Sequence, residues 1–361
     1  MKACFGMGRI GRLLLLVLLT FVSQSGLLLR AQQLPPQNPL PDAVPVVTDA
    51  NGKTHLARTP EDFSAITLQG SQLEPIPPVR GSHIVKEKFT EDILQVGWRN
   101  FDAIDLYVAK PAGVAKPPVI IYLYGYPSNM KVFSEERWLE RVTSGGYAAV
   151  GFVGALTDYR FRMRPMKQSF MTELGESLAT TTHDVQMVLN YLETRKDLDM
   201  SNVGIFGTGS GATVAILAAA ADPRIKAIEC LEPWGDWPKW VAMTNNIMPQ
   251  DRADYMKPEF LAKVAPMDPV KWLPALTNTK VQIQFIDTDD ERAKASRVDI
   301  EAAAPKTAEV RHFENRGQHF GAVSNGRLFD WIKAQLQAPA SPQPANQTRA
   351  SAQDKLSQAK P

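Results

Sequence analysis

Cysteine is scarce in this sequence, with only two residues in 361. Cys4 precedes the first long apolar run, in a segment that we expect to be removed, which would leave Cys230 alone. A mature chain of this kind cannot form an internal disulfide, and Cys230 is expected to be a small buried hydrophobe on a strand. The histidine, cysteine and aspartate residues do not cluster at the spacing of metal ligands, so no metal site is predicted.

Positive and negative charges nearly balance. The 40 Lys and Arg residues balance 38 Asp and Glu, giving a formal net charge of +2. This is too small to indicate a nucleic acid or an acidic partner, and none is predicted. With 44% hydrophobic and 22% charged residues, the composition is that of a globular chain large enough to fold without disulfides. There are no internal repeats, and nothing in the sequence indicates the oligomeric state.

The beginning of the chain has the pattern of a targeting segment. Lys2, Arg9 and Arg12 precede the apolar run Leu13–Val22, and small residues follow. This predicts an export signal over residues 1–31 and a periplasmic or extracellular protein. The alternative is a retained membrane anchor, although residues 13–29 are short for the usual span of about 20 residues.

Two segments are too polar or too rich in proline to build a core. Residues 32–82 form a proline-rich spacer and N-terminal extension, and residues 337–361 form a tail that we expect to be disordered. Between them, short apolar runs alternate with amphipathic segments, which predicts an α/β fold with a mostly parallel sheet and helices on both faces. Strands are predicted at 83–89, 103–109, 119–124, 147–153, 203–206, 225–231, 280–286 and 309–313, and helices at 135–142, 173–192, 211–221, 293–304 and 320–336.

The most informative motif is Gly207-Thr-Gly-Ser-Gly211, directly after the apolar run 203–206. In the motif G-x-S-x-G, a strand enters a sharp turn that lifts a nucleophilic serine above the sheet. Gly209 stands where that serine belongs, and Ser210 follows one residue late. Glycine adopts the positive φ of such a turn with little steric cost. The motif therefore predicts the turn without its attacking oxygen.

Two other known glycine-rich motifs resemble this segment. Gly207, Gly209 and Ala212 fit the dinucleotide-binding pattern, and Glu229 follows at about the right distance. That pattern usually occupies the first strand–helix turn of its domain, whereas several strands precede this one. A phosphate-binding P-loop needs a lysine after the last glycine, and there is none. No cofactor is predicted.

The runs 199–207 and 218–227 resemble segments of a known protein superfamily. Over residues 83–336 the chain resembles the α/β-hydrolase superfamily, nearest to dienelactone-hydrolase-like and prolyl-oligopeptidase-like esterases. The resemblance implies a catalytic acid at Asp290, with Asp289 as second choice, in the turn after 280–286. It implies a general base at His319, in a glycine-containing loop before the last helix. The backbone N–H groups of Tyr126 and Ser210 would form the oxyanion hole.

Residues 232–275 interrupt the alternation with several tryptophans and prolines. We expect them to form a small cap over the catalytic face. The aromatic side chains either build the cap's own core or line an apolar pocket. The remaining histidines are expected to be structural or solvated: His55, His83, His183 and His312.

Three functions are compatible with this set of residues. The first is a catalytically silent hydrolase scaffold whose capped pocket binds a small ester- or amide-like ligand. The second is an active serine esterase or peptidase that uses Ser210 with His319 and Asp290, which requires the turn to shift by one residue. The third is hydrolysis by a water that His319 and Asp290 activate. Titrating NAD would test the dinucleotide alternative.

Overall fold

The computed structural model describes residues 46–48, 54–56, 61–68, 78–99, 102–128, 130–156, 160, 170–287, 294–324 and 327–336. The chain divides into two compact units, residues 1–57 and 58–361. In the first, β1 (Val46–Thr48) pairs antiparallel with β2 (Thr54–Leu56). The second unit carries the remaining elements.

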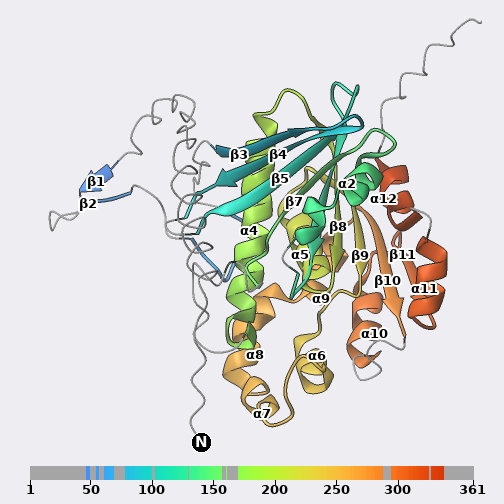
Figure 1. Cartoon of the computed structure of the whole chain (residues 1–361). Helices are drawn as coiled ribbons and strands as arrows, with labels where there is room; N and C mark the ends of the chain where they lie inside the picture. Colours follow the sequence, from blue (N-terminus) through green and yellow to red (C-terminus); the bar gives the residue numbers. More distant parts are fainter. Residues whose placement is uncertain are drawn as a thin grey trace, which may run out of the picture. The chain divides into compact units, whose positions relative to one another are not determined.

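A nine-stranded sheet forms the centre of the second unit (Figure 1). Its spatial order is β11-β10-β9-β8-β6-β7-β5-β4-β3. The strands from β11 to β7 are parallel, and β5, β4 and β3 join antiparallel, so the predicted mostly parallel sheet is confirmed. The strands are β3 (Val79–Val85), β4 (Phe89–Val96), β5 (Ile104–Pro111), β6 (Pro118–Tyr124), β7 (Ala148–Phe152), β8 (Asp199–Thr208), β9 (Ile225–Leu231), β10 (Lys280–Ile286) and β11 (Glu309–Phe313).

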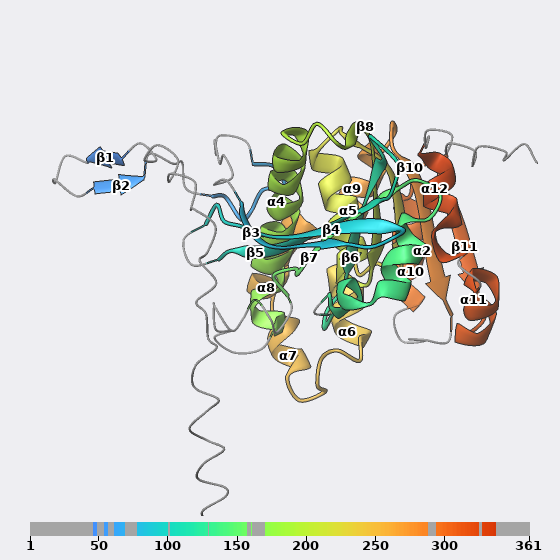
Figure 2. The same ribbon diagram turned by 45° about the horizontal axis from the view of Figure 1, so that its top comes forward.

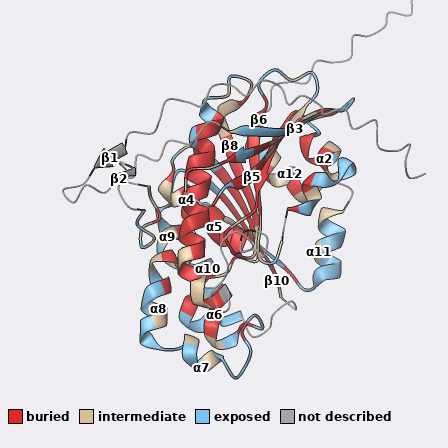
Figure 3. Cartoon of the chain, turned by 60° about the vertical axis from the view of Figure 1, so that its left-hand side comes forward, coloured by how far each residue is buried: buried red, intermediate tan, exposed pale blue. Residues whose placement is uncertain are grey.

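Helices cover both faces of this sheet (Figure 2). One apolar cluster joins the strands to α4 (Leu174–Glu193) and α5 (Ser210–Ala221). A second cluster lies on the other face, under α2 (Glu136–Thr143) and α12 (Asp330–Gln335). The inner strands are almost fully buried between these layers (Figure 3), because strands in such a sheet have no face left for water. None of the described helices is both long and apolar enough to cross a bilayer.

The predicted strand at 83–89 is wrong. That stretch contains the end of β3, a turn closed by the hydrogen bond from Lys86 N to Phe89 O at 2.9 Å, and the first residue of β4. The sequence hides β4 because Glu91 and Asp92 interrupt its apolar pattern, yet both are buried. His83 Nδ1 lies 2.7 Å from Asp92 Oδ1, across the hairpin.

The predicted continuous helix at 320–336 is also wrong. It is broken into α11 (Arg316–Val323), a short 3₁₀ turn (Arg327–Phe329) and α12. Asn315 starts α11 early, since its side chain accepts a hydrogen bond from Gln318 N at 2.9 Å. The other predicted helices are present as α2, α4, α5 and α10 (Lys294–Ala303).

The expected cap region contains α6 (Trp237–Met243), α7 (Arg252–Tyr255), α8 (Pro258–Val264) and α9 (Pro269–Trp272), with 3₁₀ turns at Ala265–Met267 and Leu273–Ala275. Trp237 and Trp240 are buried and meet edge to face, with ring centroids 5.7 Å apart. They belong to the same apolar cluster as α5, so these rings extend the main core instead of forming a separate one.

A buried ion network attaches residues 61–68 to α4. Glu61 accepts hydrogen bonds from Arg99 Nε at 2.6 Å and meets His183 Nδ1 at 2.6 Å. Burial opposes ionisation of Glu61, but the bonds from Arg99 and His183 prevail and lower its pKa to about 2. The other ring nitrogen of His183 lies 2.8 Å from Ala65 O, so the predicted structural role of this histidine is confirmed.

Candidate active site

The turn between β8 and α5 has the backbone shape of a nucleophile elbow. Gly209 is its central residue, at φ 53° and ψ −124°. A side chain rarely tolerates these angles unless the surroundings enforce them, whereas glycine adopts them freely. Gly209 N donates to Leu231 O at 2.9 Å, and Gly209 O accepts from Ala212 N at 3.0 Å. These bonds tie the turn to the end of β9 and to the first turn of α5.

The flanking glycines allow a close approach of backbone segments. A Cβ on Gly207 would lie 2.5 Å from the carbonyl oxygen of Gly211. A Cβ on Gly211 would overlap the carbonyl oxygen of Leu123 at the end of β6. Glycine is therefore required at positions 207 and 211 by the close packing of the backbone, whether or not the turn carries a nucleophile.

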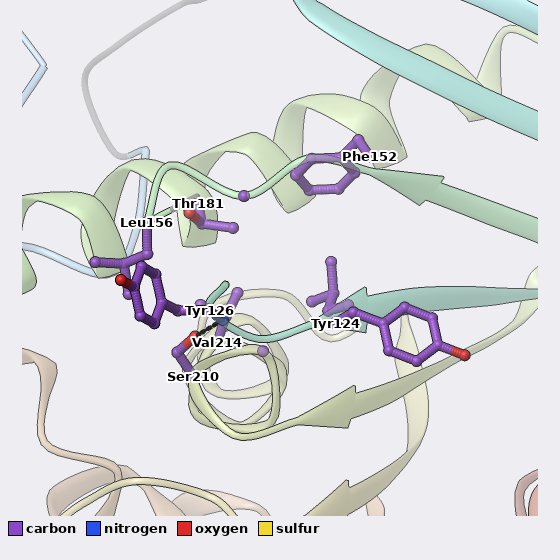
Figure 4. Close-up of a pocket in the computed structure, with 10 residues that line it drawn as sticks. Tyr124, Tyr126, Phe152, Leu156, Thr181, Ser210 and Val214 are labelled. Atoms are coloured by element: carbon purple, nitrogen blue, oxygen red, sulfur yellow. Dashed lines mark hydrogen bonds between the residues drawn. The ribbon is translucent and has the colours of Figure 1, made fainter. Parts of the chain in front are cut away.

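Ser210 is the first residue of α5 and points to the loop after β6 (Figure 4). Its hydroxyl oxygen accepts a hydrogen bond from the backbone N–H of Tyr126 at 2.9 Å. Tyr126 N is one of the two donors assigned to the oxyanion hole, and the side chain of Ser210 already occupies it. The neighbouring amide, Gly125 N, donates to Thr208 Oγ1 at 3.2 Å.

A small cavity adjoins this hydrogen bond. It measures about 20 Å³, enough for a group the size of one water. Tyr124 also borders it, but its hydroxyl points away from Ser210 (Figure 4), and burial raises the pKa of that hydroxyl above its ordinary value. The lining residues are Leu123, Tyr124, Tyr126, Phe152, Gly154, Leu156, Thr181, Ser210, Gly211 and Val214.

Trp234 faces Gly209. A Cβ built on Gly209 would lie 3.4 Å from Trp234 Nε1, an ordinary van der Waals contact. Trp234 N donates to Thr213 Oγ1 at 3.0 Å, and Thr213 Oγ1 donates to Trp234 O at 2.7 Å. Its ring packs on Trp240 with centroids 4.8 Å apart. A Cβ at position 209 would therefore not overlap this indole, although the positive φ of Gly209 would strain any side chain there.

Of the implied acid and base, the structure describes only the base. Asp290 and Asp289 lie outside the described residues. His319 lies on α11, whereas a loop was predicted, because the Asn315 cap begins the helix before it. Its ring meets Phe313 edge to face, with centroids 4.9 Å apart. His319 is not among the described residues that line the Ser210 cavity.

Glu232 is a residue that the sequence patterns did not single out. It follows β9 at φ 54°, a left-handed conformation that is uncommon outside glycine. Its carboxylate accepts from Ile286 N and from Arg297 Nη2, the latter at 2.6 Å. It thereby joins the ends of β9 and β10 to α10. A lone glutamate after a strand gives no sequence signal of this role.

The geometry does not favour the dinucleotide alternative. Glu229, which would bind a ribose, lies within β9 and is 1% exposed. Its carboxyl accepts hydrogen bonds from Gln284 Nε2 at 2.7 Å and from Ile332 N at 3.3 Å, on the α12 face of the sheet.

Cys230 is buried beneath α5, as predicted, and burial raises the pKa of its thiol. Within the described part of the chain, no cluster of His, Cys, Asp and Glu could hold a metal ion.

Comparisons with known proteins agree with this fold. Residues 104–270 match the model of the dienelactone hydrolase family. An uncharacterised 31.7 kDa protein of Escherichia coli from the traX-finO intergenic region is 27% identical over 159 residues, covering 43% of this chain. The chain spans about half the length of that curated relative, since the match covers 50% of it.

Two solved structures share the fold at low sequence identity. Acetyl xylan esterase 1 from Thermoanaerobacterium sp. JW/SL YS485 has a TM-score of 0.57 and 15% identity, covering 78% of this chain and 95% of its own. The acetyl xylan esterase from Paenibacillus sp. R4 has a TM-score of 0.53 and 14% identity, covering 76% and 91%. The chain therefore has the α/β-hydrolase fold, and its residues 104–270 are similar to the dienelactone hydrolase family.

Proposed function

We propose that this chain uses its hydrolase scaffold to bind a small ester- or amide-like ligand without forming a covalent intermediate. The observation that carries this proposal is Gly209, which occupies the bend between β8 and α5 with nucleophile-like dihedral angles and no side chain. A hydrolase of this design attacks through an oxygen on that residue. Losing the nucleophile leaves about 10³–10⁴-fold acceleration over water, far below full enzymatic rates.

The surroundings of Gly209 support binding. Ser210, Tyr126 and the apolar residues beside them enclose the cavity of about 20 Å³, which has room for one small group of a ligand, such as its carbonyl oxygen, and Trp234 covers the adjacent turn. A ligand carbonyl could take the place of the Ser210 hydroxyl and accept the hydrogen bond that the Tyr126 N–H donates to that hydroxyl. The scaffold thus keeps a polar donor in an apolar setting, which is how small-molecule sites orient their ligands.

The test adds the missing oxygen. The Gly209→Ser variant is compared with the natural protein and with Gly209→Ala, which adds the same Cβ without an oxygen. We expect a fluorophosphonate probe to label only the serine variant, detected as a mass increase, and hydrolysis of nitrophenyl acetate to rise in that variant alone. Labelling or rapid turnover by the natural protein would contradict the proposal.

A second candidate function rests on the position of the Ser210 hydroxyl, which borders the cavity and is close to a backbone donor. An active esterase using this oxygen would need it to leave Tyr126 and approach a general base. In that case the natural protein would react with the fluorophosphonate, and Ser210→Ala would abolish the reaction while Gly209→Ala would not.

A further inference from the structure

The indole of Trp234 presents a hydrogen-bond donor to the space beside Gly209 where a side chain would lie. The atom nearest to a Cβ built on Gly209 is Trp234 Nε1, at 3.4 Å, and the next two nearest belong to the same indole. A ligand oxygen in this space can approach the indole N–H to about 3 Å, the length of a hydrogen bond. An indole nitrogen only donates, so the ligand atom that it binds must be an acceptor.

This indole N–H is open to a ligand. Trp234 is half-buried, and its Nε1 forms no hydrogen bond within the described part of the chain. Nε1 is also not one of the enclosed polar atoms in that part, so it keeps contact with solvent. By contrast, Trp272 Nε1 donates to Pro266 O at 2.8 Å. The N–H of a buried tryptophan usually has such a partner, whereas that of Trp234 is left for water or a ligand.

The protein holds this indole in place from two sides. Thr213 on α5 fixes its backbone, since Thr213 Oγ1 accepts from Trp234 N at 3.0 Å and donates to Trp234 O at 2.7 Å. The ring packs on Trp240, with centroids 4.8 Å apart, and Trp240 is itself 3% exposed. A donor whose position is fixed before binding loses little entropy when a ligand arrives.

The hydrolase design indicates which ligand atoms can reach this donor. In such an enzyme the nucleophile oxygen bonds to the carbon that carries the carbonyl oxygen, and the carbonyl oxygen lies in the oxyanion hole. The donor that the family resemblance assigns to the hole is Tyr126 N, and the place of the nucleophile lies between Gly209 and Trp234. A ligand that fills both places therefore carries two oxygens on one carbon.

We propose that Trp234 is a specificity-determining residue of the proposed site, whose indole N–H binds the second oxygen of an O–C=O group in a small ester or carboxylate. An amide fits less well, because it replaces that oxygen by an N–H donor that would face the indole N–H. A site built to hydrogen-bond one partner group rejects a ligand that lacks it. This inference rests on the function proposed above and narrows its ligands to those with two oxygens on the carbonyl carbon.

The experiment follows the indole N–H signals of the isotope-labelled full chain by NMR while acetate, methyl acetate or acetamide is added. The signal lost in Trp234→Phe is that of Trp234, since phenylalanine keeps an aromatic ring on Trp240 but has no N–H. We expect this signal to move with acetate or methyl acetate, at a Kd of about 1–10 mM. The tighter of the two identifies the ligand as a carboxylate or an ester. Acetamide should bind at least about threefold more weakly, and Trp234→Phe should weaken binding about tenfold.

The matched control is Trp272→Phe, which removes an indole N–H that already has a protein partner and should leave binding unchanged. If Trp234→Phe does not fold, Gly209→Ala replaces it and is measured by saturation-transfer NMR. Its methyl group fills the space beneath the indole and should abolish binding.

A Trp234 signal that stays in place up to about 100 mM acetate and methyl acetate would overturn the inference. Binding of equal strength in Trp234→Phe, or binding that persists in Gly209→Ala, would also overturn it, as would acetamide binding as tightly as the other two. The function proposed above fails by a different result. Labelling of the natural protein by the fluorophosphonate would refute that function whether or not the Trp234 signal moves.

Discussion

The hydroxyl oxygen of Ser210 and the backbone nitrogen of Tyr126 lie 2.9 Å apart, and the amide donates to the hydroxyl. In the hydrolase design, that amide should face the oxygen of a substrate carbonyl as negative charge develops on it. Here a side chain of the protein holds the donor. If this amide acts as the proposed oxyanion donor, the Ser210 hydroxyl would compete with a ligand for it.

This competition predicts the behaviour of a double variant. Gly209→Ser alone would supply the attacking oxygen while Ser210 still holds the Tyr126 N–H. Adding Ser210→Ala should let the Tyr126 N–H donate to the substrate oxygen instead and raise kcat for nitrophenyl acetate by up to about 10²-fold, a typical contribution of one oxyanion donor. Steady-state kinetics of the two variants measure the ratio. A double variant no faster than Gly209→Ser would show that Tyr126 N is not such a donor.

The crossing of the backbone at Gly211 predicts a large loss of stability in Gly211→Ala. The new Cβ would overlap the carbonyl oxygen of Leu123, a backbone atom that cannot rotate away. We expect a destabilisation above about 4 kcal/mol or failure to fold. Gly97→Ala is the matched control, because a Cβ there meets nothing within 4 Å. Urea denaturation compares the two, and similar values would contradict the close approach.

Most of the fold could be predicted from apolar runs, because buried parallel strands leave a continuous hydrophobic signal. Strands β10 and β11 have the predicted bounds, Lys280–Ile286 and Glu309–Phe313. Strand β4 could not be found, since Glu91 and Asp92 lie in its buried part and break the pattern. Tertiary contacts, such as that of Asp92 with Arg195 at 3.2 Å, permit those charges and leave no local trace.

The site could be predicted only where geometry is local. The bend at Gly209 follows from the spacing of three glycines within five residues, and its dihedral angles agree with that spacing. The hydrogen bond between Ser210 and Tyr126 joins residues 84 apart in sequence. The sequence patterns therefore indicated the Tyr126 amide as a donor but did not show that the Ser210 hydroxyl accepts from it. For His319, the predicted loop is helical because Asn315 caps it, and an Asn–Gln pair three residues apart is the signal that could have shown this.

The buried ion network under α4 predicts that Asp184 is essential for stability. Asp184 is 0% exposed and accepts hydrogen bonds from Arg99, at 2.5 Å, and from Arg160. Asp184→Asn would leave two buried guanidinium groups short of negative charge, at a cost of about 3–5 kcal/mol. The control is Asp254→Asn, which breaks the exposed pair with Lys257 and should cost less than about 1 kcal/mol. Equal melting temperatures of the two variants would rule out the network's role.

The buried carboxyl of Glu91 predicts that the folded protein loses stability as the pH rises. It is 2% exposed, and its Oε1 has no hydrogen-bond partner in the described part of the chain. Burial raises the pKa of Glu91 from 4.5 to about 7. Because the folded-state pKa lies above the unfolded value, the neutral carboxyl's contribution is complete below about pH 4.5 and is lost as pH rises through about 7.

Glu91→Gln keeps the shape and removes the titration. Relative to the natural protein, it should gain about 1–3 kcal/mol of unfolding free energy between about pH 5 and pH 9, a range that allows for partial screening by solvent. Urea denaturation at both pH values measures this. Glu87→Gln, in the exposed turn before β4, controls for loss of a carboxylate and should show the same small effect at both. A pH-independent difference for Glu91→Gln would mean that the Glu91 carboxyl stays ionised in the folded protein.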